Sequence, residues 1–109
     1  MKRLTVLACV AAMSFGPGHA LAVDAAAADA LVRKSKCFTC HHKTKEKDGP
    51  PFAETAEKYR GKPEAIEKLI KHVTVPSKVK VDGSEEDHET LRSDDPADAK
   101  NVVEWILSF

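Results

Sequence analysis

Cys37-Phe38-Thr39-Cys40-His41 is the stretch of this 109-residue chain that decides how the rest of it folds. Two cysteines separated by two residues and followed at once by a histidine form the pattern C-x-x-C-H. On a helical turn, Cys37 and Cys40 fall on one side, and both thiols can bond to the edge of one planar group. The next residue, His41, then projects its imidazole toward the centre of that group. The pattern is the attachment signature of a c-type haem, with two thioether bonds to the vinyl groups and a histidine on the iron.

Two other interpretations of the cysteine pair compete with haem. A C-x-x-C pair alone is typical of redox dithiols, but those need a βαβ context, and the sequence has none. A zinc site would draw on Cys37, Cys40, His72 and His88, without the second tight ligand pair of convincing zinc signatures. Haem is therefore the preferred interpretation, with one covalent haem c per chain.

The first 22 residues predict a secretory signal peptide, although an uncleaved membrane anchor remains the alternative. Lys2 and Arg3 precede the apolar run at 4–15, which is too short to span a bilayer, and Ala20-Leu21-Ala22 is a small-x-small cleavage site. Residues 23–109 would then form one small periplasmic domain with 15 basic and 17 acidic side chains. This charge balance is not that of a nucleic-acid-binding protein, which needs a strong basic excess.

The pattern of apolar residues predicts an all-α class. A helix is expected over 25–36, running directly into Cys37, and a short one over 52–59 that is ended by Gly61. A third is expected to begin with Pro63 at its first position. The stretch 74–95 carries no periodic pattern and predicts a long loop without a sheet. The pair Asp95-Pro96 then predicts the N-cap and first residue of a terminal helix.

With these elements placed, the chain resembles the class I c-type cytochromes, of the small bacterial monohaem kind that includes cytochromes c551 and c5. The resemblance rests on the helix entering C-x-x-C-H, on Gly49-Pro50-Pro51-Phe52, and on the closing stretch 103–108 around Trp105. It implies a small class I cytochrome c fold wrapped around the haem. It also implies that the Pro50 carbonyl accepts a hydrogen bond from the His41 ring, and that Trp105 is a packing residue near the haem.

The sequence departs from this family in one respect, because Met1 and Met13 are its only methionines and both lie in the predicted signal peptide. The family's sixth iron ligand, a methionine sulfur, is therefore missing. His88 follows His41 by 47 residues, nearly the family's spacing to that methionine, and is the expected distal ligand. His72 is the weaker candidate. Lys78, Lys80 or an open iron are the remaining alternatives.

These observations predict an electron carrier and not an enzyme, because iron closed by two axial histidines, His41 and His88, has no site for a substrate. Basic residues outnumber acidic ones 13 to 6 over 33–80, whereas acidic residues outnumber basic ones 9 to 2 over 81–109. Lysines around the motif predict redox partners with an acidic docking patch, met by a monomer. The alternative is a haem sensor in which a displaceable His88 opens the iron to a small ligand.

Overall fold

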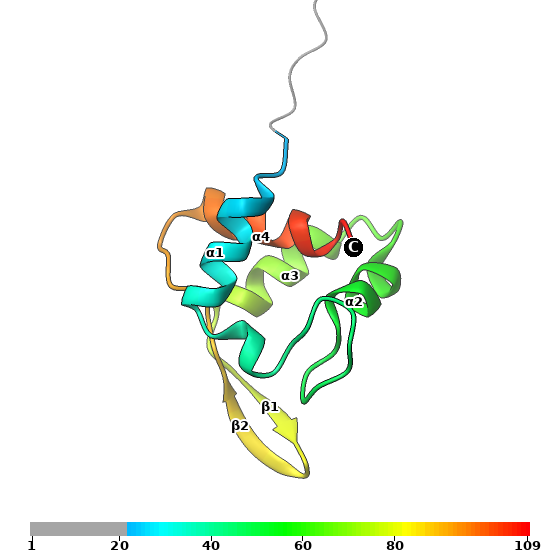
Figure 1. Cartoon of the computed structure of the whole chain (residues 1–109), viewed down its shortest axis with the longest axis vertical. Coiled ribbons are helices and arrows are strands. Elements are labelled where there is room, and N and C mark those ends of the chain that lie inside the picture. The colour runs from blue at the N-terminus through cyan, green and yellow to red at the C-terminus, as the bar shows by residue number, and fades with distance from the viewer. Residues whose placement is uncertain (1–21) are drawn as a thin grey trace, which may run out of the picture.

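The computed structural model describes residues 22–109, so the predicted signal peptide lies outside the described residues except for Ala22. Within this range the elements are α1 (Ala25–Lys34), a 3-10 turn η1 (Cys37–Thr39), α2 (Phe52–Tyr59), α3 (Ala65–Thr74), β1 (Ser77–Val81), β2 (Ser84–His88) and α4 (Pro96–Ile106). The helices gather into one body, from which the two strands project as a ribbon (Figure 1). The predicted all-α class is confirmed, with this ribbon as an addition.

The core lies where α1 crosses α4. Val32 of α1 and Val102 of α4 are 1 % exposed, and Val103 is fully buried. Two reciprocal hydrogen bonds close the crossing, because the Asp24 amide donates to Asn101 Oδ1 at 2.8 Å and Asn101 Nδ2 donates to the Asp24 carbonyl at 2.9 Å. The packed helices α1 and α4 therefore fix the point at which the segment after α1 begins.

Two of the predicted helix boundaries are wrong. The first helix ends at Lys34, and Lys36 adopts a left-handed backbone with φ 61°, so the helix does not run directly into Cys37. The third helix begins at Ala65, which leaves Pro63 in the turn before it. The other boundaries agree with the prediction. Gly61 has φ 72° just past α2, and the Asp95 carboxylate caps α4 by accepting from the Ala97 amide at 2.9 Å.

The expected loop at 74–95 contains a β-hairpin, which corrects the prediction that this stretch has no sheet. Strands β1 and β2 pair antiparallel, with Ser77 opposite His88 and Val81 opposite Ser84. The turn is Asp82-Gly83, with φ 48° and 82°, and two positive φ values are what a two-residue hairpin turn of type I′ requires. Lys78 and Asp87 lie opposite each other and form an ion pair of 2.6 Å.

The segment after the hairpin returns to the helical body at two points. The Leu91 amide donates to the Val73 carbonyl of α3 at 2.8 Å. The Arg92 amide donates to the hydroxyl of the fully buried Ser35 at 2.9 Å. These bonds hold the base of the hairpin, and with it His88, against both α3 and the end of α1. Within the described residues, no helix is long and apolar enough to cross a membrane.

Candidate functional site

The segment that carries the two cysteines is a tight turn held by its own backbone. The Cys37 carbonyl accepts from the Cys40 amide at 3.2 Å and from the His41 amide at 2.9 Å. The side chains of both cysteines are partly exposed. The turn brings the two sulfurs and His41 to the same region of the molecule.

The ring of His41 is fixed from behind by the chain that follows it. Its Nδ1 lies 2.8 Å from the Pro50 carbonyl oxygen, and a carbonyl can only accept, so this nitrogen carries the proton and donates. Gly49 allows the close approach, because a Cβ there would lie 2.5 to 3.0 Å from three atoms of the ring. With Nδ1 engaged, Nε2 is the nitrogen of His41 that remains available to a ligand.

His88 lies across from His41 at the base of the hairpin. The centroids of the two rings are 6.2 Å apart, and their planes cross at 73°. His88 Nδ1 is buried and has no hydrogen-bond partner among the described residues. Burial lowers the pKa of His88, and the nearby His72 and His41 lower it further. The structure therefore brings two of the sequence-predicted residues close together, with their ring planes steeply crossed, and favours the neutral form of His88.

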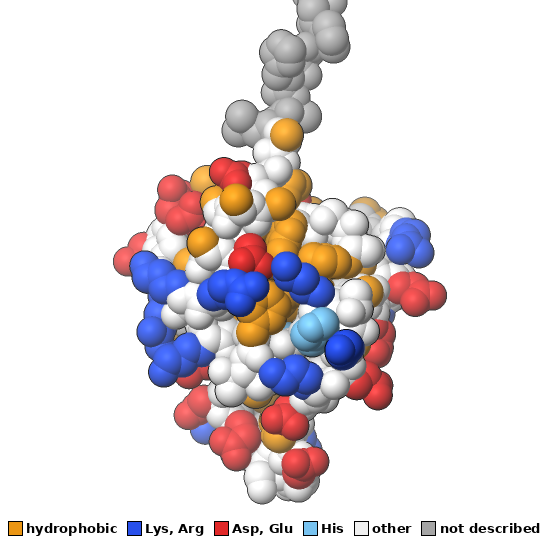
Figure 2. Space-filling model, viewed as in Figure 1, with side chains coloured by type: hydrophobic (Ala, Val, Ile, Leu, Met, Phe, Trp, Pro, Cys, Tyr) orange, Lys and Arg blue, Asp and Glu red, His pale blue; other side chains and the backbone are white. Residues whose placement is uncertain are grey.

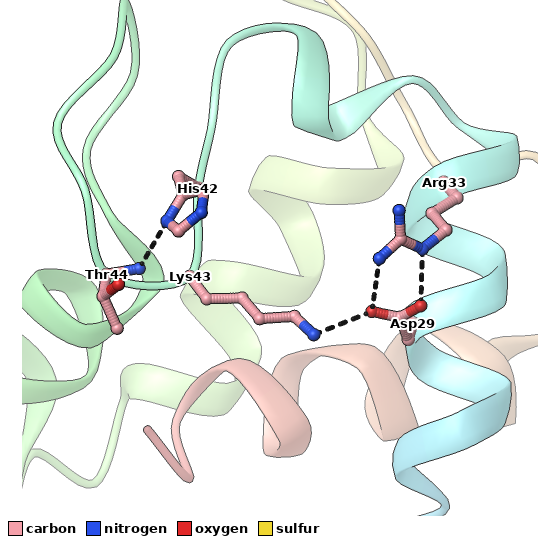
Figure 3. A network of polar contacts seen from close by, with 5 residues as sticks. All are labelled: Asp29, Arg33, His42, Lys43 and Thr44. Carbon is pink, nitrogen blue, oxygen red and sulfur yellow. Dashed lines mark hydrogen bonds and ion pairs between the residues drawn. The ribbon is translucent and has the colours of Figure 1, made fainter.

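The other two histidines of the described chain differ in their surroundings. The ring of His72, on α3, lies against that of His88 with centroids 4.1 Å apart. His72 keeps an exposed side, and desolvation of the remainder, followed by the effect of His41, lowers its pKa. His42 is instead part of the loop, where its Nδ1 accepts from the amide of Thr44 at 3.0 Å (Figure 3). It also accepts from the amide of Lys45 at 3.0 Å.

Aromatic side chains line the protein side of His41. Phe52 lies 5.7 Å from His41, 5.8 Å from Phe38 and 5.8 Å from Trp105, measured between ring centroids. Trp105 is 6 % exposed and also packs against Phe109 at 5.2 Å. The contacts agree with the packing role expected of Trp105. The sequence reasoning did not single out Phe38 or Phe109, whose only signal was their aromatic character.

The carboxylate of Asp29 on α1 binds two basic side chains near the C-x-x-C-H motif, Arg33 and Lys43. Asp29 of α1 accepts from Arg33 at 2.6 Å and pairs with Lys43 at 3.1 Å (Figure 3). These two partners, Arg33 first, lower the pKa of Asp29. Lys43 also lies 5.5 Å from the Trp105 ring centre, and Lys47 donates to the Phe38 carbonyl at 2.6 Å. In Figure 2, Lys and Arg side chains border an apolar strip on this face of the molecule.

The arrangement of a C-x-x-C-H turn, a carbonyl-bound histidine and helices crossing behind them is that of a class I c-type cytochrome. The family model for cytochrome c matches residues 25–109. The chain belongs to the cytochrome c family, and it binds one covalent haem c with its iron. Among the described residues, no three histidine, cysteine, aspartate or glutamate side chains are grouped as a separate metal site.

Known relatives cover most of the chain. Cytochrome c-552 of Hydrogenobacter thermophilus is 31 % identical over 82 residues, which are 72 % of this chain and 78 % of that protein. The class 1 cytochrome MtoD of Sideroxydans lithotrophicus is 52 % identical, with a TM-score of 0.75 over 80 % of this chain and 97 % of that one. Cytochrome c552 of Nitrosomonas europaea is 26 % identical, with a TM-score of 0.58 over 73 % and 96 %.

The contact between Gly49 and His41 yields the first prediction. Gly49→Ala is expected to push the His41 ring away from the Pro50 carbonyl, because the new methyl group would overlap three ring atoms. Overpacking of this kind costs about 1–3 kcal/mol, measured as the free energy of unfolding of the haem-loaded protein in denaturant. Asp48→Ala, at the exposed neighbouring position, is the matched control. Equal stability of Gly49→Ala and the unmodified protein would contradict the expected overlap.

Proposed function

We propose that this chain is a periplasmic single-electron carrier whose haem iron is ligated by His41 and His88. The observation that carries the proposal is the separation of the two rings, 6.2 Å between centroids. A metal–nitrogen bond of about 2 Å on each side, added to the half-width of each ring, brings two imidazoles on opposite faces of one ion to about 6 Å. The spacing between the two rings fits one iron between them.

Two further observations support the fit of haem to these residues. A buried polar atom without a partner costs free energy, and His88 carries one such ring nitrogen. Gly49 leaves room that a Cβ would fill, so the chain can hold the His41 ring against Pro50. Cys37 and Cys40 would form the thioethers, and Phe52 and Trp105 would pack on the protein side. When bound, haem supplies an iron that alternates between ferric and ferrous states by taking up and releasing one electron.

The chain's own residues would limit this chemistry to electron transfer. If His41 and His88 both held the iron, no position on it would be left for a substrate, which separates a carrier from an enzyme. The hairpin favours a carrier over a sensor with a displaceable ligand, because His88 pairs with Ser77 and the next segment is bonded to Val73 and Ser35. Carbon monoxide added to the reduced protein tests the alternative, since rapid and complete binding would favour the sensor.

The location proposed for this carrier rests on the N-terminal segment. Residues 1–22 have the basic start, apolar run and small-residue cleavage site of a secretory signal, and haem attachment of this type occurs outside the cytoplasm. The mature chain would begin at Val23, two residues before α1 starts at Ala25. We expect a monomer that meets donor and acceptor proteins at the haem edge.

The ligand role of His88 is tested by substitution. His88→Ala is expected to convert the low-spin visible spectrum to a high-spin one, because the alanine cannot bind iron. His88→Met is expected to restore low-spin iron at a higher reduction potential, since methionine–histidine ligation raises it. Asp87→Ala, at the exposed neighbouring position of β2, is the control. A low-spin spectrum in His88→Ala would remove His88 from the site.

Acid should release the distal ligand. Burial lowers the pKa of His88, so the native chain keeps the ring neutral and binds fewer protons than the unfolded chain below about pH 6.5, the pKa of a free imidazole. Protons also compete with iron for the same ring nitrogen, so iron ligation is expected to weaken as the pH falls. The expected result of an absorbance titration is a transition to high-spin iron in acid. A spectrum unchanged down to about pH 4, more than two units below that pKa, would contradict the expectation.

The charges around the motif predict how electron transfer depends on salt. The basic residues concerned are Arg33, Lys34, Lys36, Lys43, Lys45 and Lys47. Oxidation by the anion ferricyanide is expected to slow several-fold between low salt and about 1 M, where the Debye length has shrunk to about 3 Å. Lys45→Glu should slow it at low salt more than Lys100→Glu on α4 does. Stopped-flow rates that do not depend on salt would contradict a basic docking surface.

A further inference from the structure

His72 lies beside the proposed iron site, and its ring contacts that of His88 although His72 is not a proposed ligand. Its centroid lies 4.1 Å from that of His88, with the planes tilted by 41°. This is the distance of two side chains in van der Waals contact, much shorter than the 6.2 Å that separates His88 from His41. His72 therefore lies beside His88 and contacts its ring directly.

Both rings of this pair are carried by backbone that is held in place. His72 belongs to the last turn of α3, where the Thr74 hydroxyl donates to the Ile70 carbonyl at 2.7 Å. His88 is the last residue of β2 and lies opposite Ser77. Ser77 itself comes only three residues after the end of α3 at Thr74. The hydrogen bond from the Leu91 amide to the Val73 carbonyl joins the segment that follows His88 to the same turn of α3. The contact between the two rings is thus fixed by the connections around it.

The two proposed ligands differ in how the chain orients them. An imidazole bound to a metal through one nitrogen can turn about that bond, so its plane is set by what touches the ring and by a hydrogen bond to the other nitrogen. For His41 that bond is the 2.8 Å contact with the Pro50 carbonyl. No side-chain hydrogen bond among the described residues orients the ring of His88 in this way. Of the aromatic rings around His88, that of His72 is much nearer than that of His41, and its contact can set the plane of the His88 ring.

We propose that His72 is a positioning residue, which holds the ring of His88 so that its plane crosses that of His41 steeply, at the observed 73°. The proposal rests on the proposed ligation of iron by His41 and His88. It assigns His72 no bond to the iron. It also explains why an exposed face of α3 carries a histidine directly beside the site.

The crossing angle has a spectroscopic consequence that does not depend on electron-transfer activity. Each ligand ring interacts most strongly with the iron d orbital that lies perpendicular to its plane. Rings that cross steeply act on two different d orbitals and leave them close in energy, whereas parallel rings act on the same one and split the pair. Low-spin ferric iron with steeply crossed rings therefore gives a highly anisotropic electron paramagnetic resonance signal with one dominant low-field feature. Parallel rings give a rhombic signal with three resolved features.

The experiment compares three haem-loaded variants with the unmodified ferric protein by low-temperature electron paramagnetic resonance. The unmodified protein is expected to give the anisotropic signal. His72→Ala should remain low-spin but lose that signal in favour of a rhombic or mixed one, because the freed ring of His88 turns. His72→Phe, which keeps a flat ring against His88, should restore the anisotropic signal. Lys71→Ala, at the exposed neighbouring position of α3, should leave it unchanged.

Other outcomes would overturn the proposal in distinguishable ways. A rhombic signal in the unmodified protein, or an anisotropic signal retained in His72→Ala, would mean that His72 does not orient His88. A rhombic signal in His72→Phe would mean that a ring at this position is not sufficient. High-spin iron in His72→Ala together with low-spin iron in His88→Ala would make His72 the ligand and would overturn the proposed function as well. Circular dichroism of each variant verifies that the helices are retained.

Discussion

The hydrogen bond from the His41 ring to the Pro50 carbonyl is the constraint around which the haem region is arranged. It joins the C-x-x-C-H turn to the chain nine residues later, and it needs the backbone at Gly49 to touch the ring. The Gly49 amide in turn donates to the Cys40 carbonyl at 2.7 Å, so the loop closes on itself. Directly after Pro51, helix α2 begins with Phe52, whose ring packs between His41 and Trp105. One side of the site is thus built mainly from residues close together in the sequence, from the C-x-x-C-H turn to Phe52, with Trp105 of α4 packed behind them.

The distal side is assembled differently, from segments that the hairpin separates. His72 comes from α3 and His88 from β2, and they meet because the hairpin folds back to its starting point. Bonds to Val73 and Ser35 then connect this region to α3 and α1. The residues around His41 are therefore placed by contacts between neighbours in the sequence, whereas the position of His88 depends on the tertiary structure.

This difference determines how much of the structure could be predicted from the sequence. The motif, the resemblance around Gly49-Pro50 and the Asp95 cap are local signals. The presence of the helices and the His41–Pro50 contact were predicted correctly, although two helix boundaries were not. The hairpin was missed because its strands are exposed and charged, with a burial pattern that lacks a buried face. The left-handed backbone of Lys36 was missed because lysine has no special preference for that conformation, which glycine adopts most readily. His72 was considered only as a competing ligand, since sequence spacing does not reveal that two rings touch.

The position of His88 at the base of the hairpin, opposite Ser77, bears on how proteins of this shape can diverge. The turn at Asp82-Gly83 lies at the far end of the ribbon from His88. Side chains alternate between the two faces of a strand, so adding or removing one residue from each strand near the turn keeps the pairing of the base intact. An unpaired insertion within β2 would instead turn His88 to the opposite face. The length of the ribbon is thus free to vary between relatives in matched steps, while the register at its base is not.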